Sequence, residues 1–258
     1  MDCIEGMKQI DDNSIDLVIT SPPYDKIRDY VGFSLDLKSV GVEISRILKN
    51  GGICAMVIQD QTKDGRKSLT SFKTIVDWCN TEMDLWECCI YQRSGTPGAW
   101  WSKRFRVDHE YIPIFIKGKR PQYFNKEHMK ELTKPEYGST KKGLGNRKTD
   151  GSTTYDANKI YELPIEKDQG TIMHYKNSSR ETPKSSKIGK IKLKHPATFP
   201  NKLAEDFIKC FTQEGMIVLD PFMGSGTVAK MAKNNLRNYI GFELSEEYCE
   251  ISKAMIEI

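Results

Sequence analysis

A glycine-rich turn near the C-terminal end limits the possible folds of this chain more than any other stretch. Met216 to Leu219 is an apolar run of strand length, Thr227 to Asn235 has helical periodicity, and Tyr239 to Phe242 is a second strand. The turn between the first strand and the helix contains Gly224 and Gly226, which allow a tight bend and the close approach of a ligand. A strand–glycine turn–helix–strand unit is typical of nucleotide-binding α/β folds, although a bare connection is the alternative.

An acidic residue follows the second of these strands. Glu243 lies 19 residues after Gly224, about where nucleotide-binding folds place a carboxylate that accepts hydrogen bonds from ribose hydroxyls. The turn departs from G-x-G-x-x-G because position 229 is Ala, and it is not a G-x-x-x-x-G-K-[ST] phosphate loop. The spacing therefore predicts a nucleotide-like ligand but does not separate a dinucleotide from S-adenosylmethionine.

The rest of the chain alternates short apolar runs with helical periodicity, which indicates an α/β fold with a mainly parallel sheet. Pro113 lies inside one predicted strand, and because proline lacks an N–H we expect this strand at a sheet edge or with a bulge. Ser245 is expected to cap the last helix. The other expected helices are a short one that follows Ile4 and ends at about Ile10, and residues 40–48, 71–79 and 201–211. The other expected strands are residues 15–19, 53–58, 85–91 and 109–116.

Residues 117–194 have little periodicity and carry 19 Lys and Arg against 9 Asp and Glu. Their balance of +10 leaves −6 for the remaining residues, since the whole chain carries +4. A basic segment within an acidic body is a candidate surface for a polyanion such as DNA, and a solvated Lys-rich insertion is the alternative. The candidate DNA-binding residues are Lys103, Arg104, Arg106, Lys141, Lys142, Arg147 and Lys148.

The composition argues against several classes of protein. No apolar run approaches the ~20 residues that span a bilayer, and residues 1–15 have no secretory pattern. The seven cysteines form no CxxC pair, and the four histidines lack metal-ligand spacing. We therefore expect a cytoplasmic protein with no bound metal and no membrane partner.

The turn after the first predicted strand has a distinct chemistry. Ser21-Pro22-Pro23-Tyr24 follows the apolar run Leu17-Val18-Ile19. Two successive prolines fix the backbone and remove two N–H donors, so the nearby carbonyls and the Ser21 hydroxyl form an acceptor site suited to an amino group. Tyr24 offers a ring on which a base can stack. A rigid strand exit with a packed tyrosine is the alternative explanation.

Several stretches together resemble the DNA amino-methyltransferases, in the form that this family uses for cytosine N4. The turn resembles the catalytic signature of that family, and the glycine turn resembles its cofactor loop. Because the catalytic turn precedes the cofactor loop, the order is that of the circularly permuted β group. The matching blocks are Ile19–Tyr24, Arg46–Gly52, His109–Tyr111, Lys194–Leu203, Asp220–Thr227, and Arg237–Leu244 with Tyr248.

The resemblance implies a Rossmann-like class I methyltransferase fold that uses S-adenosylmethionine to methylate a flipped base of double-stranded DNA. Residues 1–116 and 195–258 would form one methyltransferase domain, and residues 117–194 a target-recognition insertion. The implied catalytic residues are Ser21, Pro22, Pro23 and Tyr24. The implied cofactor-binding residues are Asp2, Thr20, Phe199, Asn201, Asp220, Phe222, Gly224, Ser225, Gly226, Thr227 and Glu243.

The family usually has a strand before the Asp that corresponds to Asp2, and this sequence has none. We therefore expect either a shortened sheet edge or a start that lies too late. No cysteine nucleophile is expected, because the amino nitrogen attacks the methyl group directly and the chain lacks a Pro-Cys pair.

The resemblance further implies a bacterial restriction–modification system, with N4-methylcytosine as product, a location near the nucleoid and a cognate endonuclease. Ser21 in place of Asp, together with Phe199-Pro200, favours cytosine N4 over adenine N6. Two other classes remain as alternatives: a nicotinamide-dependent oxidoreductase and a non-catalytic nucleic-acid-binding paralogue. The recognition sequence and the oligomeric state stay open, with a homodimer as one option.

Overall fold

The structure is a computed structural model. It describes residues 1–23, 35–93, 105, 107–132, 140–162, 164–175, 187–188, 191–192 and 200–257. Within these ranges the backbone alone is described at residues 63, 132, 140–142, 144, 146, 161–162, 187–188 and 191–192. The chain divides into two compact units, Met1–Asn125 with Thr171–Ile258, and Lys126–Gly170.

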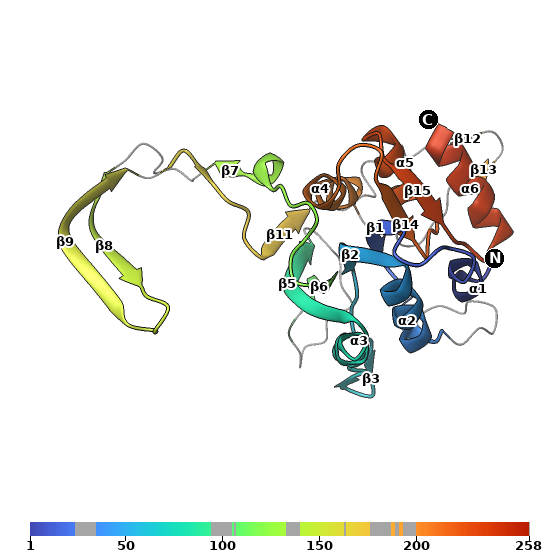
Figure 1. Ribbon diagram of the computed structural model, residues 1–258, viewed down its shortest axis with the longest axis horizontal. Coiled ribbons are helices and arrows are strands. Elements are labelled where there is room, and N and C mark those ends of the chain that lie inside the picture. The colour runs from blue at the N-terminus through green and yellow to red at the C-terminus, as the bar shows by residue number, and fades with distance from the viewer. Residues whose placement is uncertain are drawn as a thin grey trace. The chain divides into compact units, whose positions relative to one another are not determined.

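A mixed seven-stranded sheet forms the centre of the larger unit (Figure 1). Four neighbouring strands, β2, β1, β14 and β15, are parallel, and β6 runs antiparallel to both of its neighbours. This arrangement confirms the α/β fold class. In spatial order the strands are β11 (Ile172–Tyr175), β5 (Met83–Arg93), β6 (His109–Lys117), β2 (Leu48–Met56), β1 (Ile15–Thr20), β14 (Ile217–Asp220) and β15 (Asn238–Gly241).

Strand β1 is an interior strand of this sheet, between β2 and β14, and all six of its residues are buried. Such a continuous apolar run is expected where helices cover both faces of a parallel strand. Asp16 is the charged exception, and its carboxylate accepts hydrogen bonds from Lys49 Nζ at 2.7 Å and from the Ile217 N–H at 2.8 Å. The buried charge is therefore paired, and it ties β1 to the strands on both sides.

The helices pack in two rows on opposite sides of the sheet (Figure 1). Helices α1, α2 and α3 contact one another in one row, and α4, α5 and α6 in the other. Gly41 of α2 lies against the buried indole of Trp78 in α3, where a Cβ would approach the ring to 2.4 Å. The bounds are α1 (Cys3–Met7), α2 (Leu37–Ile47), α3 (Thr70–Cys79), α4 (Asn201–Phe211), α5 (Thr227–Asn234) and α6 (Glu246–Glu257). No helix in the described ranges is long and apolar enough to cross a membrane.

The strand that contains Pro113 was expected at a sheet edge or with a bulge, and only the edge position is wrong. β6 is not an edge strand, because it pairs with β5 on one side and with β2 on the other. The ladder to β2 stops at Ile114 and resumes only at the Tyr111–Ile58 bridge, so the missing proline N–H falls in a gap of that ladder. The register with β5 also shifts nearby, between Leu85 and Glu87.

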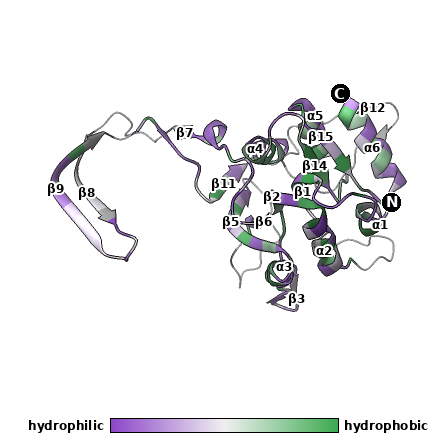
Figure 2. Ribbon diagram, in the orientation of Figure 1, coloured by the Kyte–Doolittle hydropathy of each residue, from purple (hydrophilic) through white to green (hydrophobic). Residues whose placement is uncertain are grey.

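The smaller unit, Lys126–Gly170, consists mainly of a long hairpin of β8 (Thr140–Arg147) and β9 (Thr153–Glu162). A short 3-10 helix (Glu127–Met129) and the β7–β10 pair (Glu131–Leu132 and Glu166–Lys167) precede and follow it. The hairpin is mostly polar or neutral in hydropathy, whereas the central strands are apolar (Figure 2). The larger unit has two further short pairs, β3–β4 (Thr62–Lys63 and Arg66–Lys67) and β12–β13 (Lys187–Ile188 and Ile191–Lys192).

The charge of the smaller unit differs from that of the whole insertion expected from sequence. Residues 126–170 carry 9 Lys and Arg against 8 Asp and Glu, a balance of only +1. The remaining +9 of the basic excess lies in residues 117–125 and 171–194, which belong to the larger unit. The compact unit is therefore nearly neutral, and the basic charge flanks it in the sequence.

Candidate active site

The carboxyl ends of the four parallel strands meet at one edge of the sheet. Residues 21–23 follow β1, residues 221–226 follow β14, and Glu243 comes shortly after β15. Open α/β sheets bind their ligands at this edge. The catalytic turn, the glycine turn and the acidic residue expected from sequence therefore leave neighbouring strands on the same side of the sheet.

The first link across this edge joins Thr20 to Asp220, which are 0% and 3% exposed. Thr20 Oγ1 donates a hydrogen bond of 2.8 Å to Asp220 Oδ1. The same oxygen accepts a 3.0 Å hydrogen bond from the Phe222 N–H, and the Thr20 carbonyl accepts one of 2.8 Å from the Val57 N–H. The strand before the catalytic turn is thus tied both to the glycine turn and to the exit of β2.

Burial raises the pKa of the Asp220 carboxyl to about 7. The hydrogen bonds from Thr20 and from the Phe222 N–H favour the ionised form and lower the pKa, whereas the negative charge of Glu243 raises it. The carboxyl therefore changes its charge within the range of pH in which most enzymes work.

The glycine turn and Glu243 are in direct contact. Glu243 Oε2 accepts a 2.9 Å hydrogen bond from the Gly224 N–H, and its Oε1 accepts from the N–H groups of Leu244 and Ser245, each at 2.9 Å. The turn ends at Gly226, whose φ of +84° precedes helix α5 and where a Cβ would lie 2.9 Å from the Ser252 Cβ. The conformation and the packing both require glycine at this position.

The residues around Asp2 reach the same edge. The Asp2 carboxylate caps α1 by accepting from the N–H groups of Ile4 at 2.9 Å and Glu5 at 3.2 Å. The Met1 ammonium group donates to the Glu243 carbonyl at 2.7 Å. The backbone at Asp2 therefore lies close to the end of β15, although its carboxylate already holds the helix start.

The structure places the remaining candidates as follows. Pro22 is buried, Ser21 and Pro23 are half-buried, and Phe222 packs against the core. Asn201 is the first residue of α4, and Ser225 and Thr227 are buried at the start of α5. Tyr24, Lys103, Arg104, Arg106 and Phe199 lie outside the described residues.

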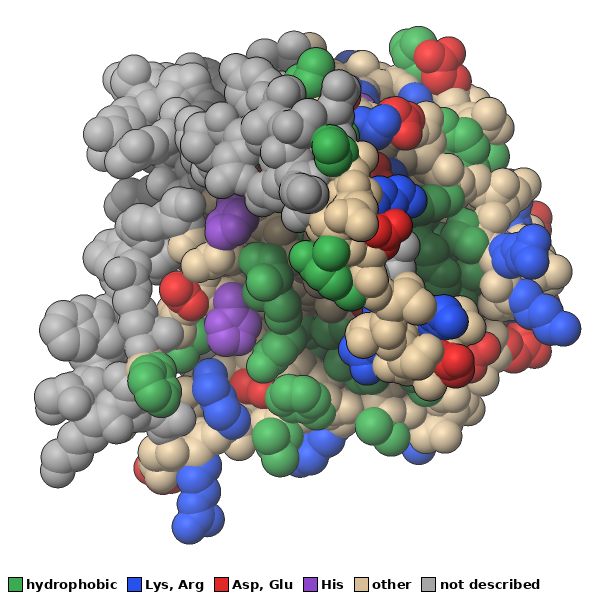
Figure 3. Space-filling model, turned by 90° about the vertical axis from the view of Figure 1, so that its left-hand side faces the viewer, with side chains coloured by type: hydrophobic (Ala, Val, Ile, Leu, Met, Phe, Trp, Pro, Cys, Tyr) green, Lys and Arg blue, Asp and Glu red, His purple; other side chains and the backbone are tan. Residues whose placement is uncertain are grey.

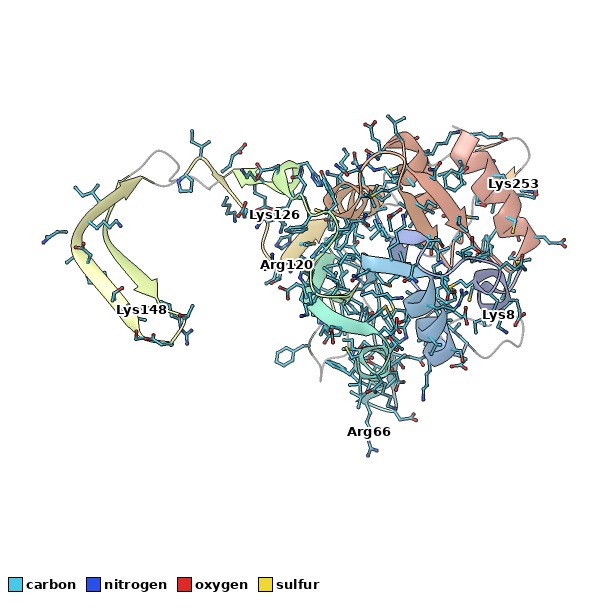
Figure 4. All side chains as sticks on the ribbon, in the orientation of Figure 1. Lys8, Arg66, Arg120, Lys126, Lys148 and Lys253 are labelled. Carbon is cyan, nitrogen blue, oxygen red and sulfur yellow. The ribbon has the colours of Figure 1, made fainter. Side chains whose placement is uncertain are left out.

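The four candidate DNA-binding residues of the smaller unit lie in its hairpin. Lys141 and Lys142 belong to β8, with only their backbone described, and Arg147 is the exposed last residue of that strand. Lys148 is exposed at the hairpin tip, where Figure 4 labels it.

Sequence reasoning missed a pocket of about 550 Å³ in the larger unit. One of its lining residues is Gln59, which comes two residues after Val57. The Val57 N–H donates to the Thr20 carbonyl, so the pocket lies near the end of β1. The Tyr111 ring meets the Phe72 ring edge-on, with centroids 5.4 Å apart, and the His109 ring at 5.3 Å. A hollow bordered by hydrophobic and histidine side chains is visible in Figure 3. The lining residues are Gln59, Asp60, Gly65, Lys67, Leu69, Phe72, Phe105, Val107, His109 and Tyr111.

The only sequence signal for this pocket is that Gln59 and Asp60 directly follow an apolar run of strand length. The rings of Phe72 and Tyr111 come from α3 and β6, which meet only in the folded chain. Across the described part of the chain, no group of three or more His, Cys, Asp or Glu side chains is arranged to hold a metal ion.

Comparisons with known proteins place this geometry in a family. Residues 15–254 match the family model described as DNA methylase, N6_N4_Mtase. The orphan methyltransferase M.BamHII of Bacillus amyloliquefaciens is 36% identical over 253 residues, which cover 97% of this chain and 91% of that protein. The type II methyltransferase M.HpaI of Haemophilus parainfluenzae is 26% identical and covers 98% of this chain and 72% of its own.

Solved structures share the fold at lower sequence identity. The PvuII DNA methyltransferase (cytosine-N4-specific) has a TM-score of 0.70 and 21% identity over 99% of this chain and 84% of its own. The complex of M1.HpyAVI with SAM has a TM-score of 0.62 and 20% identity over 100% of this chain and 97% of its own. Since the family model spans nearly the whole sequence, the chain belongs to the N6/N4 DNA methylase family.

Proposed function

We propose that this DNA methyltransferase transfers a methyl group from S-adenosylmethionine to the exocyclic N4 of a cytosine that is flipped out of duplex DNA. The observation that carries the proposal is the junction of the Ser21–Pro23 turn with the glycine turn through the Thr20–Asp220 hydrogen bond. The turn that can accept an amino group follows β1, and the nucleotide-type loop follows β14. These two strands are paired neighbours in the sheet. The cytosine-N4 specificity in the name of the PvuII enzyme supports the choice of base.

The residues present fit S-adenosylmethionine. The glycine turn, which ends at Gly226 with a φ of +84°, lets the backbone come close to a ligand. Glu243 Oε2 accepts from the Gly224 N–H and can accept a second hydrogen bond from a ribose hydroxyl. Asp2, whose backbone lies near the end of β15, would contribute to the adenine end of the site, and the M1.HpyAVI structure contains SAM in the same fold. The cofactor supplies an electrophilic methyl group on a sulfonium. The further proposed contacts are Phe199, Asn201, Phe222, Gly224, Ser225 and Thr227.

The proposed chemistry at the turn follows from its acceptors. The amino nitrogen of cytosine is a poor nucleophile because its lone pair is delocalised into the ring. The Ser21 hydroxyl and the Pro22 carbonyl would accept its two hydrogens and favour a pyramidal nitrogen. The same dipoles would stabilise the positive charge that develops there, and alignment with the methyl group would supply much of the acceleration.

A cysteine nucleophile is unnecessary in this scheme. Cys54 is fully buried in β2, and burial raises the pKa of its thiol above the usual range, so the thiol stays protonated. The chain also has no Pro-Cys pair, and we propose direct transfer to the nitrogen.

Base flipping is part of the proposal because the N4 group is out of reach inside a duplex. The pocket of about 550 Å³ is larger than a single base, and the Phe72 and Tyr111 rings in its wall offer apolar contact surface. Stacking on Tyr24 would offset part of the unstacking of the duplex, by roughly 1–3 kcal/mol.

The target-recognition role of residues 117–194 also remains a proposal, as do the division of the catalytic domain at residues 116 and 195, a cognate endonuclease and a nucleoid location. Phosphate contacts would come from the basic side chains expected from sequence, of which Arg147 and Lys148 are exposed at the hairpin tip. Adenine N6 is the second candidate acceptor, because the family model covers both kinds of amino-methylase.

Methyl transfer is tested by incubating the protein with unmethylated duplex DNA and S-adenosylmethionine labelled in its methyl group. We expect label in the DNA, and none when the cofactor or the protein is left out. DNA that stays unlabelled while the cofactor binds would overturn the proposal. RNA and unrelated protein serve as control acceptors and should stay unlabelled.

A further inference from the structure

The Ser21–Pro23 turn is internally rigid, but it must also be held in place relative to the cofactor loop. Pro22 and Pro23 have no N–H, so the backbone of the turn cannot be fixed by donors at these two positions. Thr20 is the last residue of β1 before the turn. Thr20 is therefore well placed to fix the position of the turn relative to the cofactor loop.

The contacts of Thr20 and Asp220 meet this requirement. The Thr20 carbonyl accepts from the Val57 N–H at 2.8 Å, and the Thr20 hydroxyl donates to Asp220 Oδ1 at 2.8 Å. Asp220 Oδ1 also accepts from the Phe222 N–H at 3.0 Å, so a single oxygen contacts the residue before the catalytic turn and the start of the cofactor loop.

Burial decides between two roles for this pair. Thr20 is 0% and Asp220 3% exposed, and Asp220 Oδ1 already has two donors. The sequence resemblance implies that both side chains bind the cofactor, but side chains this deeply buried act through the backbone segments that they hold. Glu243, by contrast, is half-buried at the loop and can face a ligand.

We infer that Thr20 and Asp220 are positioning residues that set the distance between the methyl-accepting turn and the methyl-donating loop. This inference rests on the proposed function of the two segments. A displacement of about 1 Å in such a site can lower the rate roughly 100-fold. Loss of the Thr20–Asp220 hydrogen bond should therefore reduce kcat and leave the cofactor's own contacts largely in place.

The test compares Thr20→Val, which removes the hydroxyl with little change of volume, with Thr20→Ser, which keeps it. We expect Thr20→Val to lower kcat at least tenfold, with KM for DNA and Kd for S-adenosylmethionine within about threefold of wild type. Thr20→Ser should recover most of kcat. Asp220→Asn, which keeps an Oδ1 acceptor, should retain far more kcat than Asp220→Leu, which has none.

Thr74→Val is the matched control, because Thr74 is a buried threonine of α3 outside the site. It should lower the thermal midpoint without the kcat loss of Thr20→Val. The inference fails if Thr20→Val keeps wild-type kcat, if Thr20→Ser is as slow as Thr20→Val, or if cofactor binding falls in step with kcat. If wild-type protein methylates no DNA, the proposed function itself fails, which is a separate outcome.

Discussion

At the scale of single residues, Asp220 combines full burial with a pKa raised to about 7. The pKa of its carboxyl is near 3.8 in an unfolded chain. At a pH between 3.8 and about 7, the carboxyl is therefore protonated in the folded protein and ionised in the unfolded chain. Protein stability should accordingly fall as pH rises from about 4 to about 7 on account of this residue, and stay level above.

Asp220→Asn removes this dependence because an amide does not titrate. We expect the variant to gain stability relative to wild type as pH rises from 5 to 8, by on the order of a few kcal/mol in the free energy of unfolding. Urea denaturation of both proteins at several pH values measures the difference. A difference that does not change with pH would show that Asp220 titrates normally.

Ser21→Ala tests the acceptor role of the turn at the same scale. The hydroxyl is proposed to contact the amino group and not the cofactor, so we expect kcat to fall by about 10²–10³, as removal of one preorganised polar group in a comparable site does. Titration with S-adenosylmethionine should give an unchanged Kd. An equal loss of turnover and cofactor affinity would contradict the assigned role.

At the scale of elements, the sequence predicted the sheet strands β1, β14 and β15 to within one residue, because each is a short run bounded by turn residues. Strand β2 covers Leu48–Met56 and not residues 53–58, so its first five residues were not predicted. The hairpin β8–β9 was not predicted, since Tyr155 and Ile160 are 72% and 65% exposed and show no buried–exposed alternation. Strand β11 was missed as well, because it is a four-residue edge strand that depends on pairing with β5.

The candidate site divides in the same way. The two turns of the site could be predicted from the sequence, because prolines and glycines determine the shape of a turn directly. The Thr20–Asp220 hydrogen bond could not be predicted, because it joins residues that are 200 apart in the sequence. The aromatic pocket could not be predicted either, because it brings helix α3 together with strand β6.

The turn before α5 gives a prediction at the scale of elements. Gly226→Ala places a Cβ 2.9 Å from the Ser252 Cβ at a φ of +84°, so we expect a lower thermal midpoint and at least tenfold weaker binding of S-adenosylmethionine. Gly215→Ala is the matched control, since its φ is +80° with no atom within 4 Å. The control should lose about 1 kcal/mol of stability and keep cofactor affinity. Equal cofactor affinity in the two variants would contradict the role of the loop.

At the scale of the whole molecule, the basic charge is unevenly distributed along the chain. The unit Lys126–Gly170 is nearly neutral, and the segments that flank it in the sequence are basic. Phosphate neutralisation makes DNA affinity depend on salt in proportion to the number of contacts. Residues 117–125 and 171–194 are therefore expected to supply most of that dependence, and the hairpin residues only a small part.

Arg147→Gln and Lys148→Gln measure the contribution of the hairpin. If each side chain contacts one phosphate, the slope of log K against log salt should become shallower by about one for each variant. Lys253→Gln, an exposed lysine of α6 labelled in Figure 4, is the control and should leave the slope unchanged. Fluorescence anisotropy with a duplex at several salt concentrations gives these slopes, and unchanged slopes in the hairpin variants would remove these residues from the DNA contact.

The identity of the methylated nucleoside tests the central claim most directly. Unmethylated duplex DNA is incubated with the protein and S-adenosylmethionine, digested to nucleosides and separated by liquid chromatography with mass spectrometry against standards. The account predicts N4-methyldeoxycytidine from the wild-type protein and at most traces from Ser21→Ala. N6-methyldeoxyadenosine as the product would contradict the choice of cytosine, and 5-methyldeoxycytidine would contradict direct attack by an exocyclic nitrogen.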